Sequence, residues 1–365
     1  MRLMNRLILT LTTSIILVLA AASPSRATFS IVAWDPVTGD LGVAVQSKFL
    51  GVGAVVPFAK AGVGAVATQA LGNPTYGPRG LELLSMGLTP EEVIEVLTRD
   101  DPEREQRQVG IVAPGKPPAA FTGSATLSWA GHIVGDTYAV QGNILAGPEV
   151  VEAMAEAFER TAGRPLGERL IAALRAGQEA GGDSRGQQSA ALIVVRPGGG
   201  YGGYDDRMVD IRVDDHPEPI EELARIYEVW QETFLVGSWL SSLERYREEG
   251  NDEAAGLQVR WALQVLDRVE KKQGPDPDLL NALAWNLAIN DLELERALAL
   301  ARRAVELKPD SPEILDTLAE ALFRLGRVEE AIETELKAIE LDPDSAYLKE
   351  QLARFMRGKG EEKED

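Results

Sequence analysis

The chain has 365 residues, 45% of them hydrophobic, and a formal net charge of −20. This length predicts two domains, and the negative charge argues against nucleic acid or anionic lipid as a partner because both would be repelled. The absence of cysteine excludes disulfides, thiolate metal sites and a cysteine nucleophile. Only two histidines are present, neither in a metal-binding spacing, so we expect no metal site and no cofactor.

The N-terminal segment has the layout of a secretory signal peptide. Two arginines precede an apolar run at about 7–22, which is shorter than the roughly 20 residues that span a bilayer. Ser25 and Ala27 are small residues at the positions that signal peptidase reads, so a cut after Ala27 would make Thr28 the N-terminus. Cuts at 20–23 are the alternative and would leave a short tail ahead of Thr28. We expect an exported, periplasmic or extracellular protein with no stable membrane anchor after cleavage.

Residues 28–216 alternate β-rich runs, glycine turns and helical blocks. The runs TFSIVAWD and LGVAVQSKF flank a turn with Gly39 and predict a hairpin that begins at Thr28. Further strands are predicted at GAVVPFA, GVGAVATQA, RQVGIVAP, AAFTGSATLSWAG, TYAVQGNIL, SAALIVVRP and MVDIRVDD. Several runs are apolar on both faces, which predicts a layered α+β domain with helices covering the sheets.

Two helical blocks interrupt these strands, at 77–101 and 147–182. In the first, Thr89, Pro90 and Glu92 stand at the spacing of a helix N-cap with a capping box. The glycine-rich run RPGGGYGGYDDR lacks the spacing of a phosphate-binding loop, so we expect it to be a hairpin turn.

The β pattern stops near Asp215. Residues 217–250 predict a helical connector, and residues 251–365 predict tetratricopeptide-like helical repeats with a charged tail. The repeats are indicated by a 34-residue spacing, shown by Pro275, Pro309 and Pro343. Repeats of this kind dock protein partners, which is the role we expect here.

Three positions depart from the repeat pattern. Trp285 stands where a small residue is usual, and Ala301 stands where a large one is usual. Glu335 occupies the position in the second repeat that Ala301 occupies in the first, and it departs from the pattern as well. We therefore expect loose packing between neighbouring repeats.

Thr28 would acquire a particular chemistry as the first residue of the mature chain. Its hydroxyl and its free α-amine then belong to one residue, and an amine with a pKa near 7.7 can accept the hydroxyl proton. A chain without cysteine and with two histidines has few other ways to activate a nucleophile. A single extra residue upstream would convert the amine to an amide and remove the base.

The residues from Thr28 onward resemble a known family. The motifs TFSIVAWDPVTGDLGVAVQSKF, NPTYGPRGLELL, YAVQGNILAGPEVV, GGDSRGQQSAALIVVR and GGYDDRMVDIRVDD are similar to the bacterial family called domain of unknown function 1028, which is grouped with the N-terminal nucleophile (Ntn) hydrolases. The resemblance runs to the helix beyond Pro219. It implies a four-layer αββα sandwich and hydrolysis of an amide bond.

Four residues near strand ends are candidates to support Thr28. Lys48 would lower the pKa of the amine, and Ser47 would hold the amine. Asn143 and Asn73 each lie beside glycine and are candidate donors to a tetrahedral oxyanion. The alternatives are a surface lysine at a strand end, and turn residues for the other three.

The run GGDSRGQQSAAL brings polar side chains to the start of an apolar strand. Asp183, Arg185 and Gln188 are candidate substrate-binding residues for a small amide or peptide-like substrate with polar or carboxylate groups. The alternative is a solvated loop in which Asp183 and Arg185 pair locally.

Two functions follow from these patterns. The first is an exported Ntn amidohydrolase that uses Thr28, with repeats for protein–protein interaction. The alternative is a non-catalytic envelope binding or scaffold protein with a degenerate Ntn fold and a tetratricopeptide docking module. A mature N-terminus upstream of Thr28 would favour the second function. Association into a homo-oligomer is left open in both.

Overall fold

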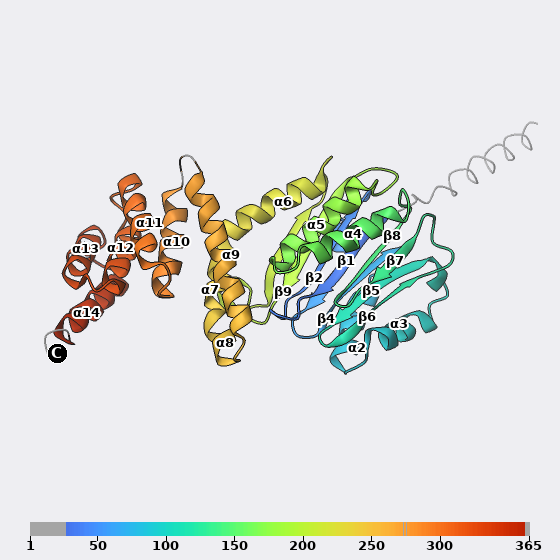
Figure 1. The fold of residues 1–365 in the computed structure, drawn as a ribbon, viewed down its shortest axis with the longest axis horizontal. Helices are drawn as coiled ribbons and strands as arrows, with labels where there is room; N and C mark the ends of the chain where they lie inside the picture. Colours follow the sequence, from blue (N-terminus) through green and yellow to red (C-terminus); the bar gives the residue numbers. More distant parts are fainter. Residues whose placement is uncertain (1–26, 273, 275, 362–365) are drawn as a thin grey trace, which may run out of the picture. The chain divides into compact units, whose positions relative to one another are not determined.

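The computed structural model describes residues 27–272, 274 and 276–361. The predicted leader therefore lies outside the described residues, apart from Ala27. The chain divides into two compact units (Figure 1). The first contains the chain up to Pro197 together with Val209–Ala224, and the second contains Gly198–Met208 together with the chain from Arg225.

A six-stranded sheet forms one layer of the first unit. Its strands lie in the order β10-β9-β2-β1-β8-β7. They are β1 Thr28–Trp34, β2 Leu41–Ser47, β7 Gly131–Val134, β8 Tyr138–Asn143, β9 Ser189–Val195 and β10 Arg207–Val213. The predicted hairpin of β1 and β2 is confirmed, with Gly39 at a φ of 77° in its turn. β1 lies between β2 and β8, so its first residue is flanked on both sides by other strands.

A four-stranded antiparallel sheet in the order β3-β4-β5-β6 packs against the first sheet. Its strands are β3 Pro57–Lys60, β4 Gly64–Ala70, β5 Arg107–Ala113 and β6 Lys116–Thr122. Aliphatic side chains from both sheets, such as Val32, Val45, Ala67 and Val112, are buried together between them. Burying these apolar surfaces from water holds the two sheets face to face.

Two pairs of helices cover the outer faces of the sheets (Figure 1). The larger sheet carries α4 Glu149–Arg160 and α5 Leu166–Glu179, and the smaller carries α2 Tyr76–Ser85 and α3 Pro90–Arg99. The predicted capping box at Thr89 and Glu92 is present at the start of α3. Gly42 lets α5 approach β2, because a Cβ there would lie 2.7 Å from a methyl of Leu170. The predicted αββα sandwich is confirmed.

Two predicted strands are wrong in part. The first two residues of GAVVPFA belong to a short 3₁₀ turn, Val52–Ala54, and the strand begins only at Pro57. In AAFTGSATLSWAG, β6 ends at Thr122 and a loop leads to β7 at Gly131. Both segments were predicted from composition, whereas a strand also requires a partner along its edge.

The second unit is helical. Its elements are the end of α6 Pro219–Trp230, a π-helical turn Gln231–Leu235, α7 Val236–Ser241, α8 Leu243–Glu248, α9 Asp252–Lys271, α10 Pro277–Ile289, α11 Leu294–Leu307, α12 Pro312–Arg324, α13 Val328–Leu341 and α14 Ala346–Glu361. The pairs α10–α11 and α12–α13 are the two predicted repeats, and α14 packs on the second pair. Leu315, Ala338 and Leu348 are buried where α12, α13 and α14 meet.

The glycine-rich run belongs to this helical unit. The indole nitrogen of Trp230 donates to Met208 O at 2.9 Å, and the Ser238 hydroxyl donates to Gly199 O at 2.9 Å. Within the described part of the chain, no helix combines the length and apolar character that crossing a membrane requires.

Candidate active site

Thr28 is the first residue of β1 and is 5% exposed. The strand register places it opposite Ser47, the last residue of β2, and opposite Asn143, the last residue of β8. Three polar residues thus lie side by side where the neighbouring strands β2, β1 and β8 begin or end. This position follows from the β1–β2 turn, which fixes the register of the hairpin.

The hydroxyl groups of Thr28 and Ser47 lie 2.9 Å apart. Both are placed to donate to Ala27 O, at 2.7 Å from Thr28 Oγ1 and 2.6 Å from Ser47 Oγ. Arg185 Nη2 donates to the same oxygen at 2.8 Å. Three donors therefore converge on the carbonyl oxygen of the peptide bond that precedes Thr28, and such donors polarise a carbonyl group.

A buried carboxylate holds Arg185 in this position. Asp183 Oδ1 accepts from Arg185 Nε at 3.1 Å, and Asp183 Oδ2 accepts from Nη2 at 2.9 Å. The backbone N–H of Lys48 also donates to Asp183 Oδ2, at 2.8 Å, which ties this loop to the end of β2. The Asp183 side chain is fully buried and its carboxylate is paired, so the guanidinium has a fixed orientation.

Three amide side chains lie beneath Thr28. Its carbonyl oxygen accepts from Gln69 Nε2 at 3.1 Å and from Asn143 Nδ2 at 3.4 Å. The same two nitrogens donate to Gln108 Oε1, at 2.7 Å and 3.2 Å. Gln108 Nε2 in turn donates to Gly142 O at 2.8 Å. The start of β1 is therefore held by a buried network of hydrogen bonds among these three amides, and such networks restrict movement.

Gln69 and Gln108 were missed by the sequence reasoning. Each is the single glutamine in a mostly apolar strand, GAVATQA for β4 and RQVGIVA for β5. Both are at most 2% exposed. A buried amide requires hydrogen-bond partners, so a glutamine inside a core strand was the signal that could have found them.

A small cavity of about 70 Å³ opens beside Thr28. Gln69 and Thr68 contribute polar groups to its wall, and Phe49, Val52 and Val56 contribute apolar ones. Such a cavity is smaller than a drug-sized binding site, which occupies about 300 Å³ or more. A cavity of this size holds only a small chemical group beside Thr28.

Two residues next to the amide network adopt a left-handed backbone conformation. Ala70 has a φ of 68° and follows Gln69, and Ile144 has a φ of 52° and follows Asn143. This conformation is unfavourable for residues with a Cβ, above all for a β-branched one, and such strain gathers at functional sites. The backbone therefore turns sharply just after each of these two amides.

A charged cluster fixes the turn after Ala70. Arg107 donates to Leu71 O and forms an ion pair with Asp101 at 3.0 Å. Burial raises the pKa of Asp101, but hydrogen bonds from Arg107 and Tyr76 outweigh this effect and hold that pKa at about 2. Asp101 is thus ionised at neutral pH and keeps Arg107 in place.

Three predicted site residues are placed apart from the Thr28 hydroxyl. Lys48 is exposed, and its ammonium donates to Gln187 O at 3.0 Å. The Asn73 side-chain oxygen accepts from the Thr75 N–H at 3.1 Å, which is turn chemistry at the start of α2. Gln188 Nε2 donates to Asp215 Oδ1 at 3.1 Å. Their predicted roles stay predictions, whereas Ser47, Asn143, Asp183 and Arg185 lie in the network around Ala27 and Thr28.

The chain matches two known families. The family of unknown function DUF1028 matches residues 28–223, and a tetratricopeptide repeat family matches residues 293–355. A search of the curated proteins found no match.

Two solved structures are similar to parts of the chain. Protein SPO2555 from Silicibacter pomeroyi, a DUF1028 protein, is 33% identical with a TM-score of 0.51, over 56% of this chain and 89% of its own. The tetratricopeptide protein TTC0263 from Thermus thermophilus is 25% identical with a TM-score of 0.28, over 37% of this chain and 68% of its own. From Thr28 to the end of the sandwich, the chain belongs to the DUF1028 family, and it carries tetratricopeptide repeats after that domain.

Proposed function

We propose that the sandwich domain is an exported Ntn-type amidohydrolase with Thr28 as nucleophile. The observation that carries this proposal is the position of the Thr28 hydroxyl, at the start of a central strand, 2.9 Å from Ser47 Oγ and beside a small cavity. The tetratricopeptide repeats suggest that the protein also binds another protein.

The proposed reaction uses one residue as both nucleophile and base. The free α-amine of Thr28 takes the proton from Oγ1, and Oγ1 attacks the carbonyl carbon of the substrate amide. When the tetrahedral intermediate collapses, the C–N bond breaks and the ammonium returns its proton to the leaving nitrogen. The product is an ester on Thr28 and a free amine. The α-amine then deprotonates a water molecule, which attacks the ester carbonyl. The C–Oγ1 bond breaks, the ammonium returns its proton to Oγ1, and a carboxylic acid is released.

The donors around Ala27 O suggest what holds the substrate oxygen. Cleavage after Ala27 removes that carbonyl and leaves Ser47 Oγ and Arg185 Nη2 without this acceptor. We infer that the two groups then donate to the carbonyl oxygen or oxyanion of the substrate. Both amide donors of Asn143 are engaged, with Thr28 O and Gln108 Oε1. An oxyanion role for Asn143 would therefore require its side chain to turn.

The burial of the processing site suggests when cleavage occurs. Ala27 is 0% exposed and Thr28 is 5% exposed. A signal peptidase needs an accessible, extended substrate, so we expect the bond between them to be cut during export, before β1 enters the sheet.

A β-lactone tests this proposal without knowledge of the substrate. Its strained ring opens when a nucleophilic oxygen attacks it, so the protein gains the whole mass of the lactone as an ester. We expect a chain that begins at Thr28 to be labelled at Thr28, at a rate that rises with pH through about 7.7 as the amine loses its proton. A chain that begins at Ala27 is the matched control, because it keeps the hydroxyl but has no free amine on Thr28. Equal labelling of both chains, or labelling at another residue, would contradict the proposal.

A further inference from the structure

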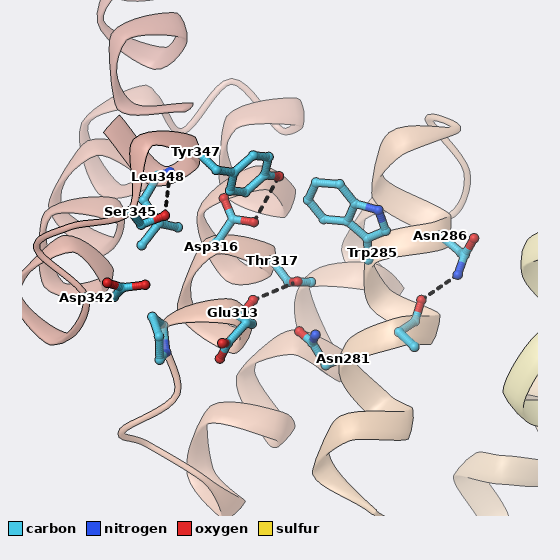
Figure 2. Close-up of a pocket in the computed structure, with 12 residues that line it drawn as sticks. Asn281, Trp285, Asn286, Glu313, Asp316, Thr317, Asp342, Ser345, Tyr347 and Leu348 are labelled. Carbon is cyan, nitrogen blue, oxygen red and sulfur yellow. Dashed lines mark hydrogen bonds between the residues drawn. The ribbon is translucent and has the colours of Figure 1, made fainter. Parts of the chain in front are cut away.

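The helical unit has a pocket of about 350 Å³ between α10, α12 and the start of α14 (Figure 2). Its walls come from the first helix of each repeat. Asn281 and Trp285 lie on α10, Glu313 and Asp316 lie on α12, and Tyr347 lies on α14. A pocket of this volume accepts a single side chain together with a short stretch of its backbone.

The charged residues of this pocket are all acidic. They are Glu313, Asp316 and Asp342, and no lysine or arginine is among the described residues that line it. At neutral pH the wall therefore presents carboxylates to any ligand. An anionic ligand would be repelled, and a cationic one would be attracted.

Asp316 is a buried carboxylate whose hydrogen bonding is incomplete. The residue is 6% exposed. Its Oδ2 accepts from the Tyr347 hydroxyl at 3.3 Å, but Oδ1 has no hydrogen-bond partner, and the same holds for Asn281 Oδ1 on the facing helix. Buried acceptors without partners are costly, so these two oxygens point to a donor that arrives from outside the chain.

The nearby cations are paired with other acids. Arg354 forms an ion pair with Glu320, and the Lys308 ammonium donates to Asp278 at 2.9 Å. Burial and the Glu320 carboxylate raise the pKa of Asp316 to about 6, which indicates that the neighbouring arginine does not neutralise it. Among the described residues, no cluster of three or more acidic or histidine side chains could hold a metal ion. An organic cation is the donor that suits this acidic wall.

Two aromatic side chains add a second feature that suits a cation. Figure 2 shows the rings of Trp285 and Tyr347 at the same side of the pocket as Asp316. The faces of such rings attract ammonium and guanidinium groups. Trp285 is also the position that departs from the repeat pattern, where a small residue is usual. This departure brings a tryptophan to the binding surface.

We propose that this pocket binds a lysine or arginine side chain of an extended, basic peptide segment in a partner protein. The cationic group lies against Asp316 between Trp285 and Tyr347, and the Asn281 side-chain oxygen accepts from the same group or from the peptide backbone. The proposal rests on the docking role of the repeats and gives it a chemistry, and it does not depend on Thr28.

Calorimetric titration of the full mature chain with two synthetic peptides tests the proposal. The probes are acetyl-(Gly-Lys)₃-amide and acetyl-(Gly-Glu)₃-amide, at physiological salt so that general charge attraction is screened. We expect the lysine peptide to bind and the glutamate peptide to show no binding. Asp316→Asn should weaken the lysine peptide at least tenfold. Glu340→Gln should change it less than twofold, because it removes the same charge from an exposed position on α13.

Further variants keep the test decisive. Glu313→Gln replaces Asp316→Asn if the latter fails to fold by circular dichroism, and Trp285→Ala should weaken the lysine peptide about fivefold or more. The proposal is wrong if the lysine peptide does not bind at millimolar concentration, or if the pocket variants and Glu340→Gln weaken it equally. β-Lactone labelling of the same samples shows separately whether the sandwich domain is competent, so each proposal fails on its own readout.

Discussion

Each unit contains a buried polar site, and the two sites differ in how their polar groups are paired. In the sandwich, the amides of Gln69, Gln108 and Asn143 bond to each other and to the Thr28 carbonyl. In the repeats, Glu335 is 0% exposed and neither of its carboxylate oxygens has a hydrogen-bond partner. A network whose polar groups are hydrogen-bonded holds a side chain in one position. Buried acids without hydrogen-bond donors destabilise the fold, and protonation or a ligand can relieve this. The first arrangement suits chemistry, and the second suits binding.

The largest expected effect is at the nucleophile. Thr28→Ala removes the hydroxyl, so we expect β-lactone labelling and amide hydrolysis to fall by about 10³-fold or more. Thr28→Ser keeps the hydroxyl and should retain part of the rate. Mass spectrometry of the labelled chains measures both. Labelling of Thr28→Ala at the original rate would show that the ordered network does not position Thr28 as a nucleophile.

Removal of the central amide should break the satisfied network. Gln108→Leu removes one buried hydrogen bond each from Gln69 Nε2, Asn143 Nδ2 and the Gly142 carbonyl. We expect a loss of about 3 kcal/mol in the free energy of unfolding of the sandwich, measured by urea denaturation. Gln264→Leu, at an exposed position of α9, should cost less than about 0.5 kcal/mol. Equal effects of the two substitutions would mean that the network is not stabilising.

Removal of the Glu335 charge should have the opposite effect and stabilise the repeats at high pH. Burial and the neighbouring Asp316 raise its pKa to about 8 in the folded chain, above the unperturbed value near 4.3. The folded state then binds more protons than the unfolded state, so this contribution to stability is full below about pH 4 and is lost as the pH rises to about 8.

Glu335→Gln tests this direction. The substitution should stabilise the repeats by about 1–2 kcal/mol at pH 8.5 and flatten their pH dependence. Hydrogen exchange of the α12 and α13 amides, corrected for intrinsic rates, measures the change. Glu340→Gln is the matched control, and a Glu335→Gln protein that is less stable at pH 8.5 would contradict the account.

We expect the smallest effect on stability from substitution of Asp316, the acid that is proposed to bind a cationic group. Without a ligand, Asp316→Asn should change the stability of the repeats by less than about 1 kcal/mol at pH 7. Burial favours the neutral side chain, while the loss of a charged acceptor for the Tyr347 hydroxyl opposes that gain. The same hydrogen-exchange experiment measures it. A loss of several kcal/mol would make Asp316 a structural residue and not a binding one.

Local patterns predicted much of the sandwich. The capping box at Thr89 depends on residues within one turn of helix, and the β1–β2 hairpin depends on its own turn. The hairpin register then places Ser47 beside Thr28, as the sequence predicts. Residues close along the chain determine these features, so no long-range contact is needed to predict them.

The rest depended on long-range packing. Gln69 reaches the Thr28 carbonyl from the opposite sheet, and Gln108 bonds to Gln69 and Asn143. No spacing in the sequence records how the two sheets face each other. Lys48 follows Ser47 directly, yet its ammonium bonds to Gln187 O at the surface. In the repeats, Trp285 and Glu335 were visible as departures from the pattern. Their surroundings became clear only when α10, α12, α13 and α14 were placed together.

The mature N-terminus of the exported protein tests the central claim most directly. Intact mass and N-terminal sequencing of the protein secreted by a Gram-negative host would give it. The account predicts a chain that begins Thr-Phe-Ser-Ile-Val, with a free amine on Thr28 and a net charge of about −23 after the loss of three leader arginines. A chain that begins at Ser23 or earlier, with no further trimming, would leave Thr28 without its base and contradict the account.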